Sequence, residues 1–294
     1  MMRFTVPSGE LKGVIVTSSR YKPEAHDLAR ELSELFAASG ARVMLDLDGE
    51  DSLAAAAAGM NLVVSVGGDG TLLATARRLG GQPTPVIGVN LGKLGFLAEF
   101  GADEALAYAR GEVVPDWPLH PKGMLSTKLR RAGAEVPQGS SLALNDVLLS
   151  QGVMSRLVDV RMRVDGAYAT EYRADGLVVS TPVGSTAYSL SLGGPILSQS
   201  LRALVVTPIA PHSLTNRPIV LPAESVIGLE LISSPKGEVA MVIDGQERVD
   251  LEAGDNIEIT SAPTAVMLVA TGRRTSFDLL RHKLHWGYGP LVND

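Results

Sequence analysis

The chain has 294 residues, 26 of them basic and 32 acidic, for a formal net charge of −6, and 45% of its residues are hydrophobic. At roughly 150 residues per domain this length predicts two domains, and the composition is typical of globular rather than disordered proteins. The charge balance argues against a broad basic surface for nucleic acid, and the absence of cysteine excludes disulfides, thiolate metal sites and a cysteine nucleophile.

The first residues of the chain, 1–13, contain no apolar stretch that resembles a signal peptide. The longest tract of apolar appearance, residues 53–66, is rich in alanine and is interrupted by Gly59 and Asn61. We therefore expect a soluble, cytoplasmic protein without a membrane partner.

Predicted strands and helices alternate through the first hundred residues. Residues 23–39 carry apolar side chains at helical spacing and follow a short apolar run at residues 14–16. Further strands are predicted at 42–47, 61–66 and 85–90, and further helices at 52–58, 72–79 and 103–110. This alternation predicts a parallel α/β sheet covered by helices.

The chain changes character near residue 120. Pro115, Pro118 and Pro121 follow one another at a spacing that helices and central strands do not tolerate, so residues 112–123 are predicted to connect two domains. Runs typical of antiparallel strands follow at 142–149, 157–164, 177–180, 226–232, 239–243 and 256–259. Asp-Gly pairs at 165–166 and 244–245 predict two-residue hairpin turns.

The predicted organisation is therefore an α/β domain over residues 1–118 and a mainly antiparallel β domain over residues 119–269. Residues 276–284 regain a helical pattern. We expect the C-terminal segment, 270–294, to return to the first domain.

A glycine-rich turn, Gly67-Gly68-Asp69-Gly70-Thr71, joins a predicted buried strand to a predicted helix. Glycines let backbone N–H groups converge on an anion at a helix N-terminus. A carboxylate there would repel bare phosphate, so Asp69 indicates either a cation that bridges phosphates or a base that takes a proton from an attacking hydroxyl. The alternative is a tight turn in which Asp69 caps the helix.

A hydroxyl-rich stretch, residues 181–195, directly follows another predicted strand. Its hydroxyls at positions 181, 185, 186, 188, 189 and 191 could donate hydrogen bonds to a sugar or a diphosphate. The alternative is a Ser/Thr-rich surface loop, although Tyr188 and the apolar Leu190 and Leu192 are unusual in one.

Asn145 and Asp146 interrupt an apolar run that predicts a strand, so their side chains are expected on opposite faces, with at least one facing the interior. A buried polar group needs partners, which a purine, a ribose or a neighbouring loop could supply. Asp244-Gly245-Gln246 is most simply a hairpin tip. His282 and His285 lack a third ligand nearby and are interpreted as surface residues rather than a metal site.

Taken together, these motifs resemble the NAD kinase family over most of the chain. Residues 67–71 match its GGDGT motif, 94–97 its LGFL-like segment and 145–146 its Asn-Glu/Asp pair. Residues 181–195 match its TPTGSTAY…GGP signature, and 211–218 its PHSL…RP element. GGDGT alone is shared with phosphofructokinases and diacylglycerol-type lipid kinases, which keeps a sugar or lipid kinase open as an alternative. A nucleotide-binding sensor is a third reading, which Asp69 argues against.

The resemblance implies an enzyme that phosphorylates the adenosine 2′-hydroxyl of NAD with ATP, or with polyphosphate in some members, and a divalent metal, Mg²⁺ by expectation, to form NADP. It implies an NAD kinase-like fold, a homodimer or homotetramer, and Asp69 as proton acceptor, with no metal-ligating side chain assigned. The binding residues it implies are Gly68, Gly70, Thr71, Phe96, Asn145, Asp146, Arg156, Arg173, Asp175, Val183, Thr186, Ala187, Tyr188, Ser189, Leu190, Ser191, Ala210, Asp244 and Gln246. Ala174, Val183 and Gly245 depart from the family's usual residues.

Overall fold

The computed structural model describes residues 2–19, 21–47, 49, 52–92, 95–151, 157–233 and 239–285. It forms two compact units, one made of residues 1–121 and 266–294 and the other of residues 122–265. The sequence predicted these boundaries at 118/119 and 269/270. Arg156, one of the implied binding residues, lies outside the described residues.

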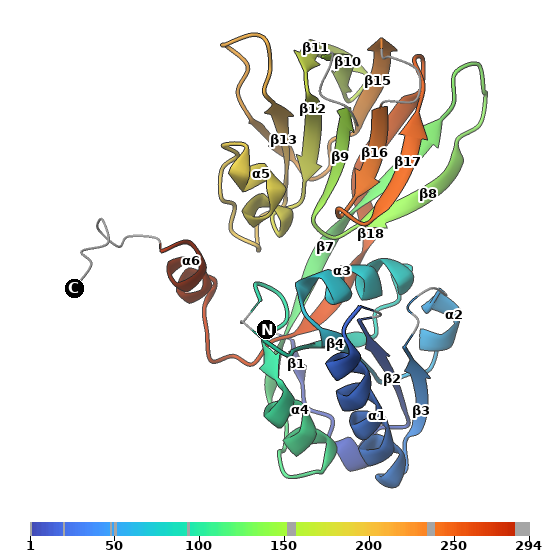
Figure 1. Ribbon diagram of the computed structural model, residues 1–294, viewed down its shortest axis with the longest axis vertical. Coiled ribbons are helices and arrows are strands. Elements are labelled where there is room, and N and C mark those ends of the chain that lie inside the picture. The colour runs from blue at the N-terminus through green and yellow to red at the C-terminus, as the bar shows by residue number, and fades with distance from the viewer. Residues whose placement is uncertain are drawn as a thin grey trace. The chain divides into compact units, whose positions relative to one another are not determined.

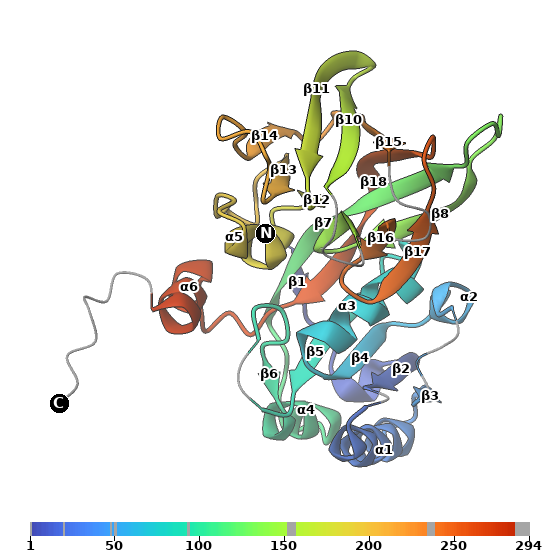
Figure 2. The same cartoon turned by 45° about the horizontal axis from the view of Figure 1, so that its top comes forward.

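The first unit is built on a parallel sheet in the order β3-β2-β4-β5-β18 (Figure 1; β5 is labelled in Figure 2). Every residue of β2 and β4 is buried, which explains why these strands appear in the sequence as continuous apolar runs rather than alternating ones. The strands of this unit are β1 (Arg3–Phe4), β2 (Gly13–Ser18), β3 (Arg42–Asp46), β4 (Leu62–Gly67), β5 (Pro85–Asn90), β6 (Phe100–Gly101) and the end of β18 (Asn256–Val269).

Helices pack against this sheet as the apolar spacing predicted. In α1, Pro23 occupies the first turn, and Leu28, Leu32 and Phe36 are buried on one face. The helices of this unit are α1 (Pro23–Ala38), α2 (Ala54–Ala57), α3 (Asp69–Arg78), α4 (Ala102–Ala109) and α6 (Ser276–Leu284), with a 3₁₀ turn, η1, at Ser8–Glu10. Within the described residues, none of these helices is long and apolar enough to span a bilayer.

Two predictions for this unit need correction. Helix α3 begins at Asp69 rather than at residue 72, so the aspartate belongs to the first helical turn. Pro118 and Pro121 lie inside a long strand, β7 (Trp117–Arg130), which the proline spacing argued against. Pro118 joins the pairing through its carbonyl, which accepts a hydrogen bond from the backbone N–H of Ala270 (2.9 Å), so its missing N–H is not needed there.

The second unit contains two antiparallel sheets. One has the order β14-β13-β12-β9-β16-β17, and the other the order β11-β10-β15-β18, with β7 and β8 continuing from it (Figure 2). The strands of this unit not yet given are β8 (Gln138–Ala143), β9 (Asp146–Gln151), β10 (Val158–Val164), β11 (Ala167–Ala174), β12 (Gly176–Ser180), β13 (Ala203–Ile209), β14 (Ile219–Pro222), β15 (Ile227–Ser233), β16 (Val239–Ile243) and β17 (Glu247–Leu251).

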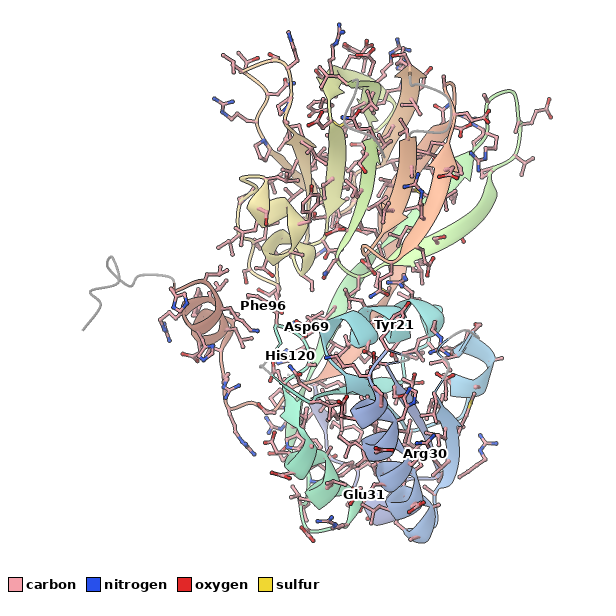
Figure 3. The ribbon with its side chains drawn as sticks, in the orientation of Figure 1. Tyr21, Arg30, Glu31, Asp69, Phe96 and His120 are labelled. Carbon is pink, nitrogen blue, oxygen red and sulfur yellow. The ribbon has the colours of Figure 1, made fainter. Side chains whose placement is uncertain are left out.

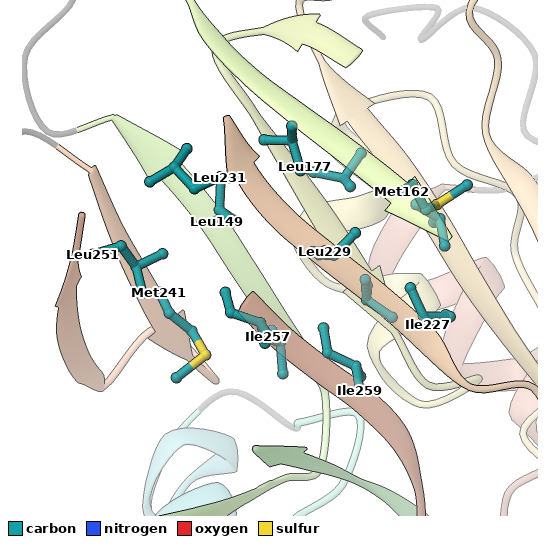
Figure 4. Close-up of a cluster of buried hydrophobic side chains, with 14 of the residues drawn as sticks. Leu149, Met162, Leu177, Ile227, Leu229, Leu231, Met241, Leu251, Ile257 and Ile259 are labelled. Carbon is teal, nitrogen blue, oxygen red and sulfur yellow. The ribbon is translucent and has the colours of Figure 1, made fainter. Parts of the chain in front are cut away.

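One apolar core joins the two sheets of this unit. Leu149, Leu177 and Met241 come from the first sheet, and Leu229 and Ile257 from the second (Figure 4). All five side chains are buried. Inward-facing apolar residues from both sheets build such a core, and alternating or β-branched apolar runs indicated these strands in the sequence.

The turns of this unit were only partly predicted. Asp165 and Gly166 form a two-residue turn with φ of 52° and 80°, as the Asp-Gly pair indicated. In the hairpin of β16 and β17, by contrast, Ile243 pairs with Glu247, so three residues form the turn rather than two. The apolar run at 142–149 is not one strand, because β8 ends at Ala143 and β9 begins at Asp146.

Candidate active site

Asp69 stands where β4 turns into α3, the position predicted for a phosphate-binding turn. Gly68 is the N-cap residue of the helix, and the N–H of Leu72 donates to the carbonyl of Gly68 (3.1 Å). Asp69 is half-buried, whereas Gly70 is exposed. The first N–H groups of a helix have no partner within it, and they carry the positive end of the helix dipole.

The carboxylate of Asp69 is held by the backbone of a second segment. Its Oδ2 accepts a hydrogen bond from the N–H of Phe96 (2.7 Å), and its Oδ1 accepts from the N–H groups of Leu97 (3.0 Å) and Ala98 (2.9 Å). Figure 3 shows Asp69 and Phe96 next to one another. Hydrogen bonds from backbone N–H groups to a carboxylate stabilise its negative charge and fix its orientation.

This contact was not predicted from the residues, because nothing in the sequence pairs a carboxylate with backbone groups 27 to 29 positions further on. The resemblance to the NAD kinase family matched both segments, residues 67–71 and 94–97, but gave no indication that they contact one another. Phe96 itself is half-buried, and the ammonium group of Lys283, on α6, lies 6.0 Å from the centre of its ring. Lys283 of the C-terminal helix thus lies within the range of a cation–π contact with this segment.

In the second unit, Asn145 and Asp146 lie at the break between β8 and β9. Asn145 belongs to neither strand, so the prediction that the two side chains alternate along one strand was wrong. The carboxylate of Asp244 accounts for the break, because it accepts hydrogen bonds from the N–H groups of Leu144 (3.1 Å), Asn145 (2.7 Å) and Asp146 (3.1 Å). Backbone groups that bind a side chain are not available for a strand ladder.

Asp244 is therefore more than the hairpin tip suggested by the sequence. It adopts a φ of 48° and is 8% exposed, so its side chain lies inside the unit rather than in solvent. An aspartate before glycine at a turn is ordinary in a sequence, and only its burial distinguishes this one. Its position against residues 144–146 links two segments that are 98 to 100 residues apart.

Asp146 is buried close to Asp244. Burial, with a further contribution from the negative charge of Asp244, raises the pKa of Asp146 to about 7. The residue is 6% exposed, and Asp146 pairs with Ser180 across β9 and β12. A carboxyl group with this pKa exchanges a proton near neutral pH, unlike an ordinary surface aspartate.

The hydroxyl-rich stretch forms a 3₁₀ turn, η2 (Gly184–Thr186), and a short helix, α5 (Tyr188–Ser191). Its hydroxyls were expected to face a ligand, and this expectation needs correction for four of them. Thr181 donates to the carbonyl of Leu144 (2.7 Å), Ser185 to that of Pro182 (2.7 Å), Thr186 to that of Val183 (3.1 Å), and Ser189 shares a hydrogen bond with Thr207 (2.8 Å). These four hydroxyl groups therefore form hydrogen bonds inside the protein and stabilise the conformation of the loop.

The remaining implied residues differ in exposure. Val183 is buried at 4% exposure, Ala187 and Leu190 are half-buried, and Tyr188 and Ser191 are exposed. Arg173, Ala210 and Gln246 are also exposed, and Asp175 accepts a hydrogen bond from the amide of Gln151 (2.9 Å).

The turn that bears Thr181 is fixed to the segment of Asn145. The N–H of Thr181 donates to the carbonyl of Asn145 (2.9 Å), and a Cβ at Gly184 would lie 2.0 Å from the same carbonyl oxygen. Asp244 on one side and the 181–184 turn on the other thus determine where Asn145 lies. The second unit brings Asn145, Asp146, Asp244 and Thr181 together, while Asp69 and Phe96 meet in the first unit.

Among the residues that the structure describes, no group of three or more His, Asp and Glu side chains is arranged to hold a metal ion. Asp69 has its carboxylate oxygens engaged with backbone N–H groups.

Comparison with known proteins assigns these features to a family. Residues 49–111 match the ATP-NAD kinase N-terminal domain, and residues 144–271 match the ATP-NAD kinase C-terminal domain. The chain is 37% identical to a protein named NAD kinase from Citrifermentans bemidjiense, with 94% of this chain and 99% of that protein covered. It is 43% identical to a protein of the same name from Geotalea daltonii, with 77% of this chain and 79% of that protein covered.

Solved structures show the same fold. A yeast NADH kinase complexed with NADH superposes with a TM-score of 0.80 at 23% identity, covering 99% of this chain and 94% of that one. An NAD kinase from Archaeoglobus fulgidus in complex with ATP gives a TM-score of 0.70 at 25% identity, covering 92% of this chain and 98% of that one. With both domains matched and relatives similar over nearly the whole length, this chain belongs to the ATP-NAD kinase family.

Proposed function

We propose that this enzyme transfers the terminal phosphoryl group of ATP to the 2′-hydroxyl of the adenosine ribose of NAD, forming NADP. Membership of the ATP-NAD kinase family supports the two substrates. The single observation that carries the chemistry is the oriented carboxylate of Asp69 at the start of α3.

The proton acceptor in this proposal is one oxygen of Asp69. An ionised carboxylate has about four lone-pair positions, and three of them already accept backbone hydrogen bonds, two at Oδ1 and one at Oδ2. The position left over is on Oδ2. As the 2′-hydroxyl attacks, its O–H bond breaks and the proton moves to Oδ2, while the ribose oxygen bonds to the γ-phosphorus and ADP leaves with the bridging oxygen.

The donor nucleotide is proposed to bind at the glycine-rich turn. Gly68, Gly70 and Thr71 surround the N-terminus of α3, whose dipole favours the phosphates of ATP. A divalent cation, Mg²⁺ by expectation, would be supplied with ATP and would neutralise phosphate charge during the transfer, and no side chain is assigned to hold it. Polyphosphate, which offers the same phosphoryl chemistry, is a further donor to be tested.

Binding of NAD is proposed for the second unit. Asn145 and Asp146, held in place by Asp244, supply an amide and a carboxyl group for the adenosine portion. The exposed Tyr188, Arg173 and Gln246 supply further contacts. The other residues of this unit that the resemblance implies, and whose hydroxyls are not used inside the loop, are also proposed for the NAD site: Asp175, Val183, Ala187, Leu190, Ser191 and Ala210.

One assay tests the reaction against its alternatives. Purified protein is incubated with Mg²⁺ and γ-labelled ATP, and with NAD, a sphingosine-like lipid or fructose 6-phosphate as acceptor. The label should appear in a product that an NADP-specific dehydrogenase accepts, which requires phosphate at the 2′ position. Labelling of the lipid or the sugar instead would indicate another kinase of this fold, and binding of NAD without any transfer would indicate a sensor.

Two further proposals concern the protein in its cell. We propose a cytoplasmic location and a homodimer or homotetramer, both of which follow from the family resemblance. Sedimentation equilibrium of the purified protein would measure the oligomer, and a monomer at micromolar concentration would contradict that proposal.

A further inference from the structure

Gly95 directly precedes the segment whose N–H groups bind Asp69, and it is buried against the carboxylate itself. A Cβ placed at Gly95 would lie 2.0 Å from Oδ1, 2.6 Å from Cγ and 2.8 Å from Oδ2 of Asp69. Side-chain carbons do not approach carboxylate atoms this closely, so any other residue at position 95 requires Asp69 or the segment to move.

Neither Asp69 nor the segment that begins at Gly95 can move easily. Asp69 has a short side chain, and its backbone lies in the first turn of α3. Its carboxylate gives up hydrogen bonds to Phe96, Leu97 and Ala98 if it turns away. Leu97 and Ala98 are themselves buried, at 7% and 0% exposure, so the segment has little room to retreat.

We propose that Gly95 is a positioning residue for catalysis: the space left by its missing side chain keeps the Asp69 carboxylate in the orientation in which Oδ2 can accept the proton of the substrate hydroxyl. This inference rests on the proposed function, since it acts through Asp69. Its effect is expected on the rate of transfer rather than on nucleotide binding, because Gly95 has no side chain that could contact a ligand.

The test is a double-mutant cycle of Gly95→Ala and Asp69→Ala, with Gly92→Ala as the matched control. Gly92 lies three positions earlier and is exposed, and a Cβ at this position would meet no atom within 4 Å, so its substitution should leave kcat within about twofold of the parent. Gly95→Ala should lower kcat by about 10- to 100-fold, with KM for ATP changed by less than about threefold.

The double-mutant cycle distinguishes an effect on the position of the Asp69 carboxylate from a general loss of folded protein. In the Asp69→Ala background the obstructing carboxylate is gone, so adding Gly95→Ala should change neither kcat nor the melting temperature further. If Gly95→Ala fails to fold in the parent but folds in the Asp69→Ala background, the steric relationship is confirmed by stability. A loss that is equal in both backgrounds, or a parent-like kcat for Gly95→Ala, overturns the inference.

Failure of the proposed function gives a different result. If Asp69→Ala alone keeps parent-like kcat, Asp69 is not the proton acceptor, whatever Gly95→Ala does. If Asp69→Ala is inactive while Gly95→Ala is as active as the parent, the proposed function stands and only the role of Gly95 is lost.

Discussion

Asp244 and Asp146 are joined by two hydrogen bonds in opposite directions. The N–H of Asp146 donates to Oδ1 of Asp244 (3.1 Å), and the N–H of Asp244 donates to the carbonyl of Asp146 (2.9 Å). The three N–H groups that Asp244 binds stabilise a negative charge there. Asp146 lies buried beside that charge, which is why the proton of the pair is assigned to Asp146.

The raised pKa of Asp146 predicts a pH-dependent stability. Its pKa is about 7 in the folded protein and 3.8 as the ordinary value. Between these values the folded state holds a proton that the unfolded chain has lost, so the free energy of unfolding falls as pH rises through this window. Asp146→Asn removes this dependence and should stabilise the protein more at pH 8 than at pH 5, by about 2 kcal/mol.

Urea unfolding of both proteins at pH 5 and pH 8 measures this difference. An Asp146→Asn variant whose advantage is equal at the two pH values would contradict the assignment of the proton.

Asp244→Asn should weaken NAD binding selectively. An asparagine side chain turns at least one N–H donor toward the backbone N–H groups of residues 144–146, so hydrogen bonds to a charged acceptor are lost and the segment shifts. We expect KM for NAD to rise by about tenfold or more, while KM for ATP stays within about twofold. Steady-state kinetics with each substrate varied in turn provide both values.

The matched control is Asp165→Asn, which changes an aspartate with a similar φ at the other Asp-Gly turn of the same unit. Its Oδ1 accepts only the N–H of Val226 among the described contacts (2.8 Å). Parent-like kinetics are expected for this control. Equal increases in both KM values for Asp244→Asn would indicate general disorder of the fold rather than a shifted NAD contact.

Gly184→Ala should also act on Asn145. Its Cβ would lie 2.0 Å from the carbonyl oxygen and 2.5 Å from the carbonyl carbon of Asn145, which are backbone atoms that cannot turn aside. Overpacking of this kind destabilises by about 1–3 kcal/mol. We therefore expect a lower melting temperature together with a higher KM for NAD, whereas Gly123→Ala, which meets nothing within 4 Å, should change neither.

The first unit contains a buried ion pair that predicts a second pH effect. Arg78 donates to Oδ2 of Asp46 (2.8 Å), and each side chain is 11% exposed. Burial by itself would raise the pKa of Asp46, but hydrogen bonds from Arg78 and Thr17 and the charge of Arg78 outweigh it, so the pKa lies below its ordinary value of 3.8. Stability from this pair is therefore present above about pH 4 and is lost as the pH falls further.

Asp46→Asn should destabilise the protein by about 3 kcal/mol at pH 7, because it leaves a buried guanidinium without its counter-charge. The difference from the parent should narrow below about pH 4. Chemical unfolding at pH 7 and pH 3 tests both statements. Asp27→Asn, which alters an exposed pair with Arg30 (3.3 Å), should have almost no effect at either pH.

The fold class and most elements could be predicted from the sequence, because burial imposes a period on side chains that are near one another in the chain. Strand β5 and helix α6 have the bounds that the pattern predicted. Strands β11, β13, β14 and β17 were missed. Strands β11, β14 and β17 are largely exposed, whereas β13 is a buried run that the sequence analysis did not recognise as a strand. The prolines of β7 were misinterpreted because their tolerance depends on which partner strand is adjacent.

The candidate site was predictable as a set of motifs but not as an arrangement. Asp69 and Asp244 were both singled out, yet their contacts are with backbone groups far away in the sequence, and backbone groups leave no signature in composition or spacing. The hydroxyls of Thr181 and Ser189 were expected to face a ligand, but in the structure they form hydrogen bonds within the protein. Spacing along the chain does not reveal such partners. Long-range pairing of this kind requires the folded structure.

The central claim is that the Asp69 carboxylate accepts the proton of the NAD hydroxyl during phosphoryl transfer. Single-turnover transfer from ATP to NAD, measured for Asp69→Asn and for the exposed control Asp103→Asn, tests it most directly. We predict a rate about 10²- to 10⁴-fold below the parent for Asp69→Asn, with an unchanged circular dichroism spectrum, and a parent-like rate for the control. A folded Asp69→Asn enzyme that forms NADP within a few-fold of the parent rate would contradict it.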